Sequence, residues 1–304
     1  MRGEVDPQSS MFHYFSVESR IPADHPLRPV KKLADSALSA ISAELDGLYA
    51  RTGRPSIPPE RLLKAQLLIA FYSVRSDRQF CEQLDYNLLF RWFVGLGMDD
   101  AVWDRTVFSI NRDRLLGTDV ARQFFRRVLH LAEWQGFVSD EHFSVDGTMI
   151  EAWASHKSFV PKDGSGPDKP AGRNPEADFK GKTRSNATHQ STTDPQARLY
   201  KKGEFAEAKL RYMAHALSEN RNGLVVDVES TQATGRAEWE AAIRMIDRSV
   251  RKPGATVGAD KGYDTAEFVA ALERRGIRAH VARKVSGSAV DGRTARGKGY
   301  AMSL

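Results

Sequence analysis

The chain has 304 residues, a formal net charge of +6 and a single cysteine, Cys81. This length is enough for two domains of ordinary size, and the lone cysteine excludes an intrachain disulfide and a cysteine-rich zinc site. No apolar run is long enough to cross a membrane, and the N-terminus lacks the apolar segment of a signal peptide. A cytoplasmic location is the simplest expectation.

The positive charge is unevenly distributed along the chain. Residues 155–211 contain 12 basic and 7 acidic side chains, and residues 274–304 contain 8 basic and 1 acidic. Clustered Lys and Arg favour a polyanionic partner, because they neutralise phosphates and release counterions. Solvated loops that happen to be rich in Lys and Arg are the alternative, and the charge alone slightly favours it.

The first half of the chain has a helical pattern. Apolar residues recur at helical spacing in three segments: 58–71, 76–89 and 119–135. Ser76 and Gln79 can form a capping box at the start of the second segment. Thr118 is placed to cap the third segment, and Gly136 to end it.

The second half alternates predicted strands with predicted helices. The strands are expected at 142–150, 209–217, 224–231, 256–260 and 277–285. The helices are expected at 237–250 and 264–276. Asp264 and Glu267 can form a capping box for the second helix. Residues 155–205 are rich in Pro, Gly, Lys and Ser and predict a flexible insertion. This order predicts an α/β (α+β) protein with a mixed sheet.

Two aspartates lie where strands are predicted. Asp146 interrupts an apolar strand, and Asp260 closes the short strand TVGAD. Sites in open α/β sheets lie outside the carboxyl ends of strands, so both carboxylates would meet if the strands are neighbours. Repulsion between them would favour a bound hard cation, Mg²⁺ or Mn²⁺. Taken singly, each aspartate is better explained as a turn or helix-capping residue.

Several motifs together resemble a known family. They are SVDGTMIEA at 144–152, GADKGYDT at 258–265, GRPSIPPERLLKAQLL at 53–68 and VWDRTVFSINRDRL at 102–115. In this order they resemble bacterial insertion-sequence DDE transposases. The resemblance implies a helical DNA-binding domain at 1–137. It also implies an RNase H-like catalytic domain at 138–304 with a mixed sheet.

The resemblance also implies an activity. It implies a DNA transposase that cuts and joins strands at the ends of a mobile element, with Asp146 and Asp260 as catalytic residues and metal ligands. The cofactor would be Mg²⁺ or Mn²⁺. The partners would be double-stranded DNA, both inverted repeats and target, and further copies of the chain. Lys261 would contact a phosphate, although a solvated lysine at the start of a helix explains it equally well.

Basic side chains of the helical half are further candidates for contact with DNA. Arg105, Arg112 and Arg114 cluster on one predicted helix that could enter a groove. A solvated helix face is the alternative explanation. The tryptophans of the chain are expected to lie in cores rather than to stack on bases.

The family carries a third acid, a glutamate on a helix after the last strand. After Val285 this chain contains one acid, Asp291, in a segment that resembles the loop before that helix. We therefore expect a chain truncated at its C-terminus, without the last helix and inactive in isolation. The alternative function is a non-catalytic DNA-binding remnant that inhibits a full-length transposase.

Overall fold

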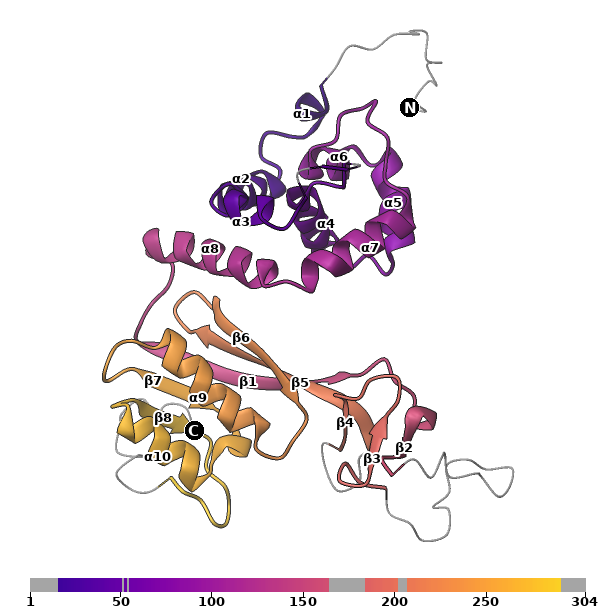
Figure 1. Cartoon of the computed structure of the whole chain (residues 1–304). Coiled ribbons are helices and arrows are strands. Elements are labelled where there is room, and N and C mark those ends of the chain that lie inside the picture. Colours follow the sequence, from indigo (N-terminus) through magenta and orange to yellow (C-terminus); the bar gives the residue numbers. More distant parts are fainter. Residues whose placement is uncertain (1–15, 51, 54, 164–183, 202–206, 291–304) are drawn as a thin grey trace, which may run out of the picture. The chain divides into compact units, whose positions relative to one another are not determined.

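The structure is a computed structural model (Figure 1). It describes residues 16–50, 52–53, 55–163, 184–201 and 207–290. The chain divides into two compact units, Met1–Gln135 and Gly136–Leu304. In the described residues, no helix has the length and apolar character needed to cross a membrane.

The described residues of the first unit form helices. They are α1 Val17–Arg20, α2 Leu27–Ser39, α3 Ser42–Asp46, α4 Pro59–Phe71, α5 Asp77–Tyr86, α6 Leu88–Val94, α7 Arg105–Leu116 and α8 Val120–Trp134. The predicted helix 76–89 is in fact two helices, because Asn87 leaves the helical conformation and its side chain caps α6. Ser76 caps α5 as predicted, accepting a hydrogen bond from the Gln79 amide at 3.2 Å.

Aromatic side chains dominate the core of this unit. Phe80 is fully buried and stacks between Phe90 and Phe108, with ring centroids 5.9 and 5.4 Å away. Burying each such ring stabilises the fold by roughly 1.5–3 kcal/mol. Arg91 is also buried, and its guanidinium donates hydrogen bonds to the carbonyls of Gly97, Met98 and Asp100. These bonds satisfy the buried charge and fix the loop after α6.

The second unit is built on a mixed sheet (Figure 1). Its strands are β1 His142–Glu151, β4 Arg198–Tyr200, β5 Lys209–Glu219, β6 Val225–Gln232, β7 Thr256–Ala259 and β8 Arg278–Val281. The path of the sheet is β4-β5-β1-β7-β8, and β6 pairs with β5. β5 is antiparallel to β1 and to β6, whereas β7 is parallel to β1 and to β8. The predicted α+β class with a mixed sheet is confirmed.

Two helices pack against this sheet. α9, Ala237–Ser249, contacts β5, β6 and β1, and α10, Ala266–Arg274, contacts β8 and α9. Alternate residues of β5 are buried, among them Met213, His215 and Leu217. Met213 lies in a hydrophobic cluster with Ala237 of α9, so this face of β5 is the one that α9 covers.

Part of the predicted insertion 155–205 is ordered. In the described residues, β2 Phe159–Pro161 pairs with β3 His189–Ser191 after a short 3₁₀ helix, η1 His156–Ser158. β4 adds to the edge of β5, where Phe159, Ala197 and Leu210 form a small core. The prediction of a flexible insertion is therefore wrong for these strands, because a few apolar residues suffice to pair them. Residues 164–183 lie outside the described part.

The cap of α10 also differs from the prediction. Thr265, not Asp264, is the N-cap and accepts a hydrogen bond from the Phe268 amide at 3.2 Å. The buried Asp264 carboxylate instead accepts hydrogen bonds from the amides of Lys284 and Ala289, at 2.7 and 2.8 Å. Burial alone would raise the pKa of Asp264, but these hydrogen bonds hold it below its usual value. Asp264 thus ties the chain after β8 to the start of α10.

Candidate active site

The sheet brings Asp146 and Asp260 to neighbouring strands. β1 and β7 are parallel, and their register pairs His142 with Thr256 and Ser144 with Gly258. Asp146 follows Ser144 by two residues in β1, and Asp260 follows Gly258 by two residues at the end of β7. Both carboxylates therefore belong to one region, beside the carboxyl end of β7.

The edge of β1 that faces β7 is open beside Asp146. β5 pairs with β1 along nearly its whole length, from Phe143 to Glu151. β7 pairs with β1 only at residues 142–144. Beyond residue 144, no strand of the described residues pairs with this side of β1, and Asp146 is exposed. A ligand can therefore approach Asp146 along the edge of the strand.

The two aspartates form local hydrogen bonds only. Asp146 accepts one from the Gly147 amide and Asp260 one from the Gly262 amide, each at 2.8 Å. Among the residues that the structure describes, no Lys, Arg or His forms an ion pair with either carboxylate. Two neighbouring carboxylates without a counter-charge favour a bound cation, because the alternative is mutual repulsion or protonation of one of them.

Lys261 and Tyr263 follow Asp260 in a short 3₁₀ helix, η3 Lys261–Tyr263. Lys261 is exposed, whereas Tyr263 is buried against Phe268, with ring centroids 5.3 Å apart. Burial raises the pKa of the Tyr263 hydroxyl, and the charges of Glu238, Asp260 and Asp146 raise it further. Tyr263 therefore keeps its proton, and its hydroxyl lies within electrostatic reach of three acids.

Glu238 is the acid that the sequence reasoning missed. It lies in the first turn of α9, after β6. β6 is antiparallel to β5, and β5 is antiparallel to β1, so β6 and β1 run in the same direction. The helix after β6 must therefore begin at the end of the sheet where Asp146 lies. An acid in the first turn of the helix that follows a predicted strand was the available signal.

The donor atoms of this region suit a hard divalent cation. Carboxylate oxygens are the ligands that Mg²⁺ and Mn²⁺ prefer, and Mg²⁺ keeps several waters beside one or two protein carboxylates. Within the described ranges, no three His, Cys, Asp or Glu side chains are close enough to form a ready-made metal cluster. The residues present thus fit a cation held by two aspartates and completed by water or substrate oxygens.

The three arginines predicted to contact DNA all lie on α7, but their surroundings differ. Arg112 forms ion pairs with Asp77 and with Asp113, which occupy its guanidinium. Arg114 donates a hydrogen bond to the Asn111 side chain at 2.8 Å and lies 5.3 Å above the ring of Tyr49. Arg105 is exposed in the first turn. Arg105 is therefore the member of this set best placed to reach a phosphate.

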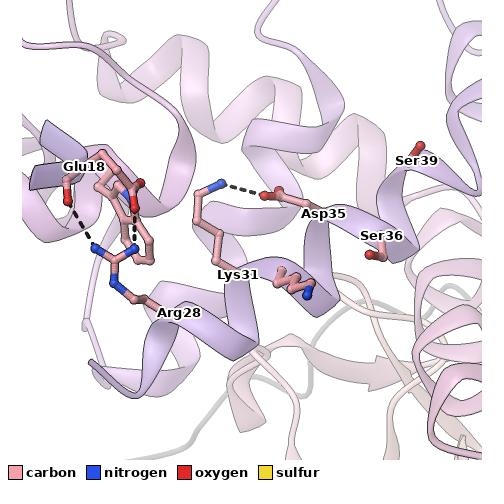
Figure 2. Close-up of a pocket in the computed structure, with 8 residues that line it drawn as sticks. Glu18, Arg28, Lys31, Asp35, Ser36 and Ser39 are labelled. Atoms are coloured by element: carbon pink, nitrogen blue, oxygen red, sulfur yellow. Dashed lines mark hydrogen bonds and ion pairs between the residues drawn. The ribbon is translucent and has the colours of Figure 1, made fainter. Parts of the chain in front are cut away.

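A pocket of about 670 Å³ lies in the helical unit and is lined by charged side chains (Figure 2). Figure 2 shows Arg28 directed at Glu18 and Lys31 at Asp35. Lys64 approaches the same Asp35 at 2.9 Å. These three cations are paired with the acids of the pocket itself, so their charge is largely offset.

Comparison with known proteins supports a relationship to transposases. Residues 15–114 match a family described as transposase domain (DUF772). The resemblance to transposases is therefore confirmed over this part of the chain. No curated protein matches the sequence.

Two solved structures are similar to the chain. One is a piggyBac transposase synaptic complex with hairpin DNA, at 11% identity and a TM-score of 0.35, covering 88% of this chain and 51% of that one. The other is a pre-cleavage Mos1 transpososome, at 12% identity and a TM-score of 0.23, covering 76% and 61%. The chain spans about half the length of the piggyBac protein that it matches.

Proposed function

We propose that this protein is an insertion-sequence DNA transposase that cleaves and joins DNA strands with Mg²⁺ or Mn²⁺. The observation that carries the proposal is that Asp146 and Asp260 follow paired residues of the neighbouring strands β1 and β7, in a chain whose residues 15–114 match a transposase domain family. Asp146 and Asp260 would hold the metal. When bound, the metal would activate the attacking oxygen and stabilise the leaving oxygen of an in-line displacement.

The chain's own groups prepare this edge for a phosphodiester. Asp146 is exposed beside the open part of β1, so a DNA strand can reach it without unpairing the sheet. Lys261, exposed directly after Asp260, would contact a phosphate oxygen and offset the negative charge that the substrate adds. The buried Tyr263 hydroxyl would keep its proton close to the acids.

The helical unit would bind the ends of the element. Arg105 is exposed on α7 and would contact the DNA backbone or a base edge. Arg114 would take part by leaving its contact with Asn111, while the ion pairs of Arg112 give it a structural role in holding α5 and α7 together. Further copies of the chain would assemble on paired ends.

The test is cleavage of DNA taken from the two stretches that flank the gene, where inverted repeats would lie. We expect strand cleavage by the purified full chain in Mg²⁺ or Mn²⁺, no cleavage in EDTA, and no cleavage by Asp146→Ala. Arg105→Ala should weaken binding to the same duplexes in a gel-shift assay. Binding of these duplexes without cleavage by the wild-type chain would overturn the proposal and identify a non-catalytic DNA-binding protein.

A further inference from the structure

We infer that Glu238 of α9 is a third carboxylate ligand of the cation held by Asp146 and Asp260. The inference rests on the proposed function, because it concerns the same metal. The sequence led us to expect a site without a third acid. Here the third acid comes from α9, the helix that follows β6 and precedes Asp260 in the chain.

The Glu238 carboxylate lies close to two glycines that neighbour the aspartates. A β-carbon on Gly147 would lie 3.5 Å from Oε1 of Glu238, in van der Waals contact with the carboxylate. A β-carbon on Gly262 would lie 3.4 Å from Oε2 of Glu238 and 3.0 Å from Oδ1 of Asp260. The carboxylates of Glu238 and Asp260 therefore flank the same point, while Gly147 is the direct neighbour of Asp146.

The open edge of β1 lets acids from both faces of the sheet reach one ion. Successive residues of a strand point to opposite faces, so Asp146 and Gly147 do not share a face. Gly147 pairs with the buried His215 on the face that α9 covers. Because β7 does not pair with β1 beyond residue 144, an ion beside this edge is accessible to Asp146 from one face and to Glu238 from the other.

Buried polar atoms without partners point into the same space. His215 is 2% exposed, and its Nδ1 has no hydrogen-bond partner. This nitrogen lies 3.2 Å from the position of a β-carbon on Gly147, on the side where Glu238 Oε1 lies. The other ring nitrogen, Nε2, lies 2.8 Å from Thr231 Oγ1. A buried nitrogen needs a partner, and water bound to a cation beside Glu238 would supply one.

The hydroxyl of Tyr263 gives a second, independent indication. Tyr263 is 1% exposed, and its hydroxyl oxygen also lacks a hydrogen-bond partner. The charges of Glu238, Asp260 and Asp146 all act on this group, which places the three acids around one buried hydroxyl. A hydrated cation among the acids would bring oxygen atoms within reach of this donor.

The chemical consequence is a site with three negative ligands rather than two. Three carboxylates hold a divalent cation more strongly, and they fix its position on the edge of β1. Since the three acids are not yet close enough to form a cluster, the Glu238 side chain would rotate towards the ion on binding or reach it through a water.

The experiment measures Mn²⁺ binding to the full chain by isothermal titration calorimetry, without DNA. The variants are Asp146→Asn, Asp260→Asn and Glu238→Gln, and the matched control is Glu240→Gln, which changes an acid in the same turn of α9. We expect Glu238→Gln to lower the affinity about tenfold or more, and Glu240→Gln to leave it unchanged. Circular dichroism spectra establish that each variant is folded.

The outcomes separate this inference from the proposed function. If Asp146→Asn and Asp260→Asn lose Mn²⁺ binding while Glu238→Gln keeps the wild-type affinity, Glu238 is not a ligand and the two-aspartate site stands. If the wild-type chain binds no Mn²⁺, or if the aspartate variants bind as well as it does, the metal site of the proposed function fails and the role of Glu238 fails with it.

Discussion

Two regions beside strand β1 place acids in opposite environments. At the amino end of β1, Phe143 pairs with Glu219 of β5, whose side chain is completely buried. At the carboxyl end of the neighbouring strand β7, Asp146 in the middle of β1 is exposed beside the open edge.

The amino end satisfies its acid fully. The Glu219 carboxylate accepts hydrogen bonds from four backbone amides, those of Ser139, Arg221, Asn222 and Leu224, at 3.3, 3.1, 2.7 and 3.2 Å. These bonds close the turn between β5 and β6 and attach the chain before β1. An acid with this many donors stabilises the fold and has little capacity left for a ligand.

The carboxyl end leaves its acids under-satisfied. Asp146 and Asp260 each accept one local amide hydrogen bond, and neither has an ion-pair partner among the described residues. The same sheet therefore uses one acid for folding and leaves others with unused acceptor capacity. The contrast indicates that hydrogen-bond satisfaction, rather than burial alone, separates a structural carboxylate from a candidate functional one.

The largest effect on stability should come from Glu219→Ala. The substitution removes the acceptor of four amides, one buried and three partly buried, and each group left unsatisfied away from water costs about 1–3 kcal/mol. We expect the free energy of unfolding to fall by about 3 kcal/mol or more in urea denaturation. Glu219→Gln, which keeps one acceptor oxygen, should lose less. Equal losses for the two variants would show that the carboxylate does not organise this turn.

The second effect is a dependence of stability on pH. Burial alone would raise the pKa of Glu219, but its four amide hydrogen bonds outweigh burial and hold the pKa below its usual value. A lowered pKa in the folded state gives stability that is complete above the pKa of the unfolded chain and is lost as the pH falls through the folded value.

This pH dependence can be measured by urea denaturation between pH 7 and pH 3. Asp264, whose pKa is also lowered, adds to the loss at low pH. Glu219→Gln should lose less stability than the wild type over this range, because the substituted side chain does not titrate. The same slope in both proteins would contradict the assignment.

A smaller effect is expected from Gly147→Ala. Its β-carbon would lie 3.2 Å from the Nδ1 of the buried His215 and against Glu238, so neighbouring side chains must shift at a cost of about 1–3 kcal/mol. The control is Gly235→Ala, where a β-carbon would meet no atom within 4 Å. Thermal unfolding should separate the two variants. A Gly147→Ala protein as stable as the control would contradict the close approach of His215.

Local patterns in the sequence predicted most of the second unit. Alternating apolar residues located β1, β5 and β6, and helical spacing located α9 and α10, because each of these elements buries one face. Short elements were missed where long-range pairing decides the structure. β2, β3 and β4 have three residues each, too few for a periodic signal. The strand predicted at 277–285 is shorter, Arg278–Val281, because its partner β7 pairs with it only over these residues.

The candidate site was only partly predictable from the sequence. Asp146 was found because it interrupts an apolar strand and Asp260 because it closes one, whereas Glu238 resembles any acid in the first turn of a helix. The expectation that tryptophans lie in cores is right for Trp92 and wrong for Trp134 and Trp153, which are 79% and 97% exposed. The predicted absence of a last helix concerns the chain after Val285, and residues 291–304, with Asp291, lie outside the described part.

The smallest effect on stability, and the sharpest contrast with Glu219, is expected from Asp146→Asn and Asp260→Asn. Without a metal, each substitution removes one of two neighbouring like charges. The free energy of unfolding should therefore stay unchanged or rise by less than about 1 kcal/mol, and the melting temperature should not fall. With Mg²⁺ or Mn²⁺ present, the wild type should be more stable than the two variants. The wild type gains stability from a ligand that binds the folded state, and the variants do not. Melting curves with and without the metal decide the matter. A loss of stability in the metal-free variants as large as that of Glu219→Ala would mean that Asp146 and Asp260 are structural acids like Glu219.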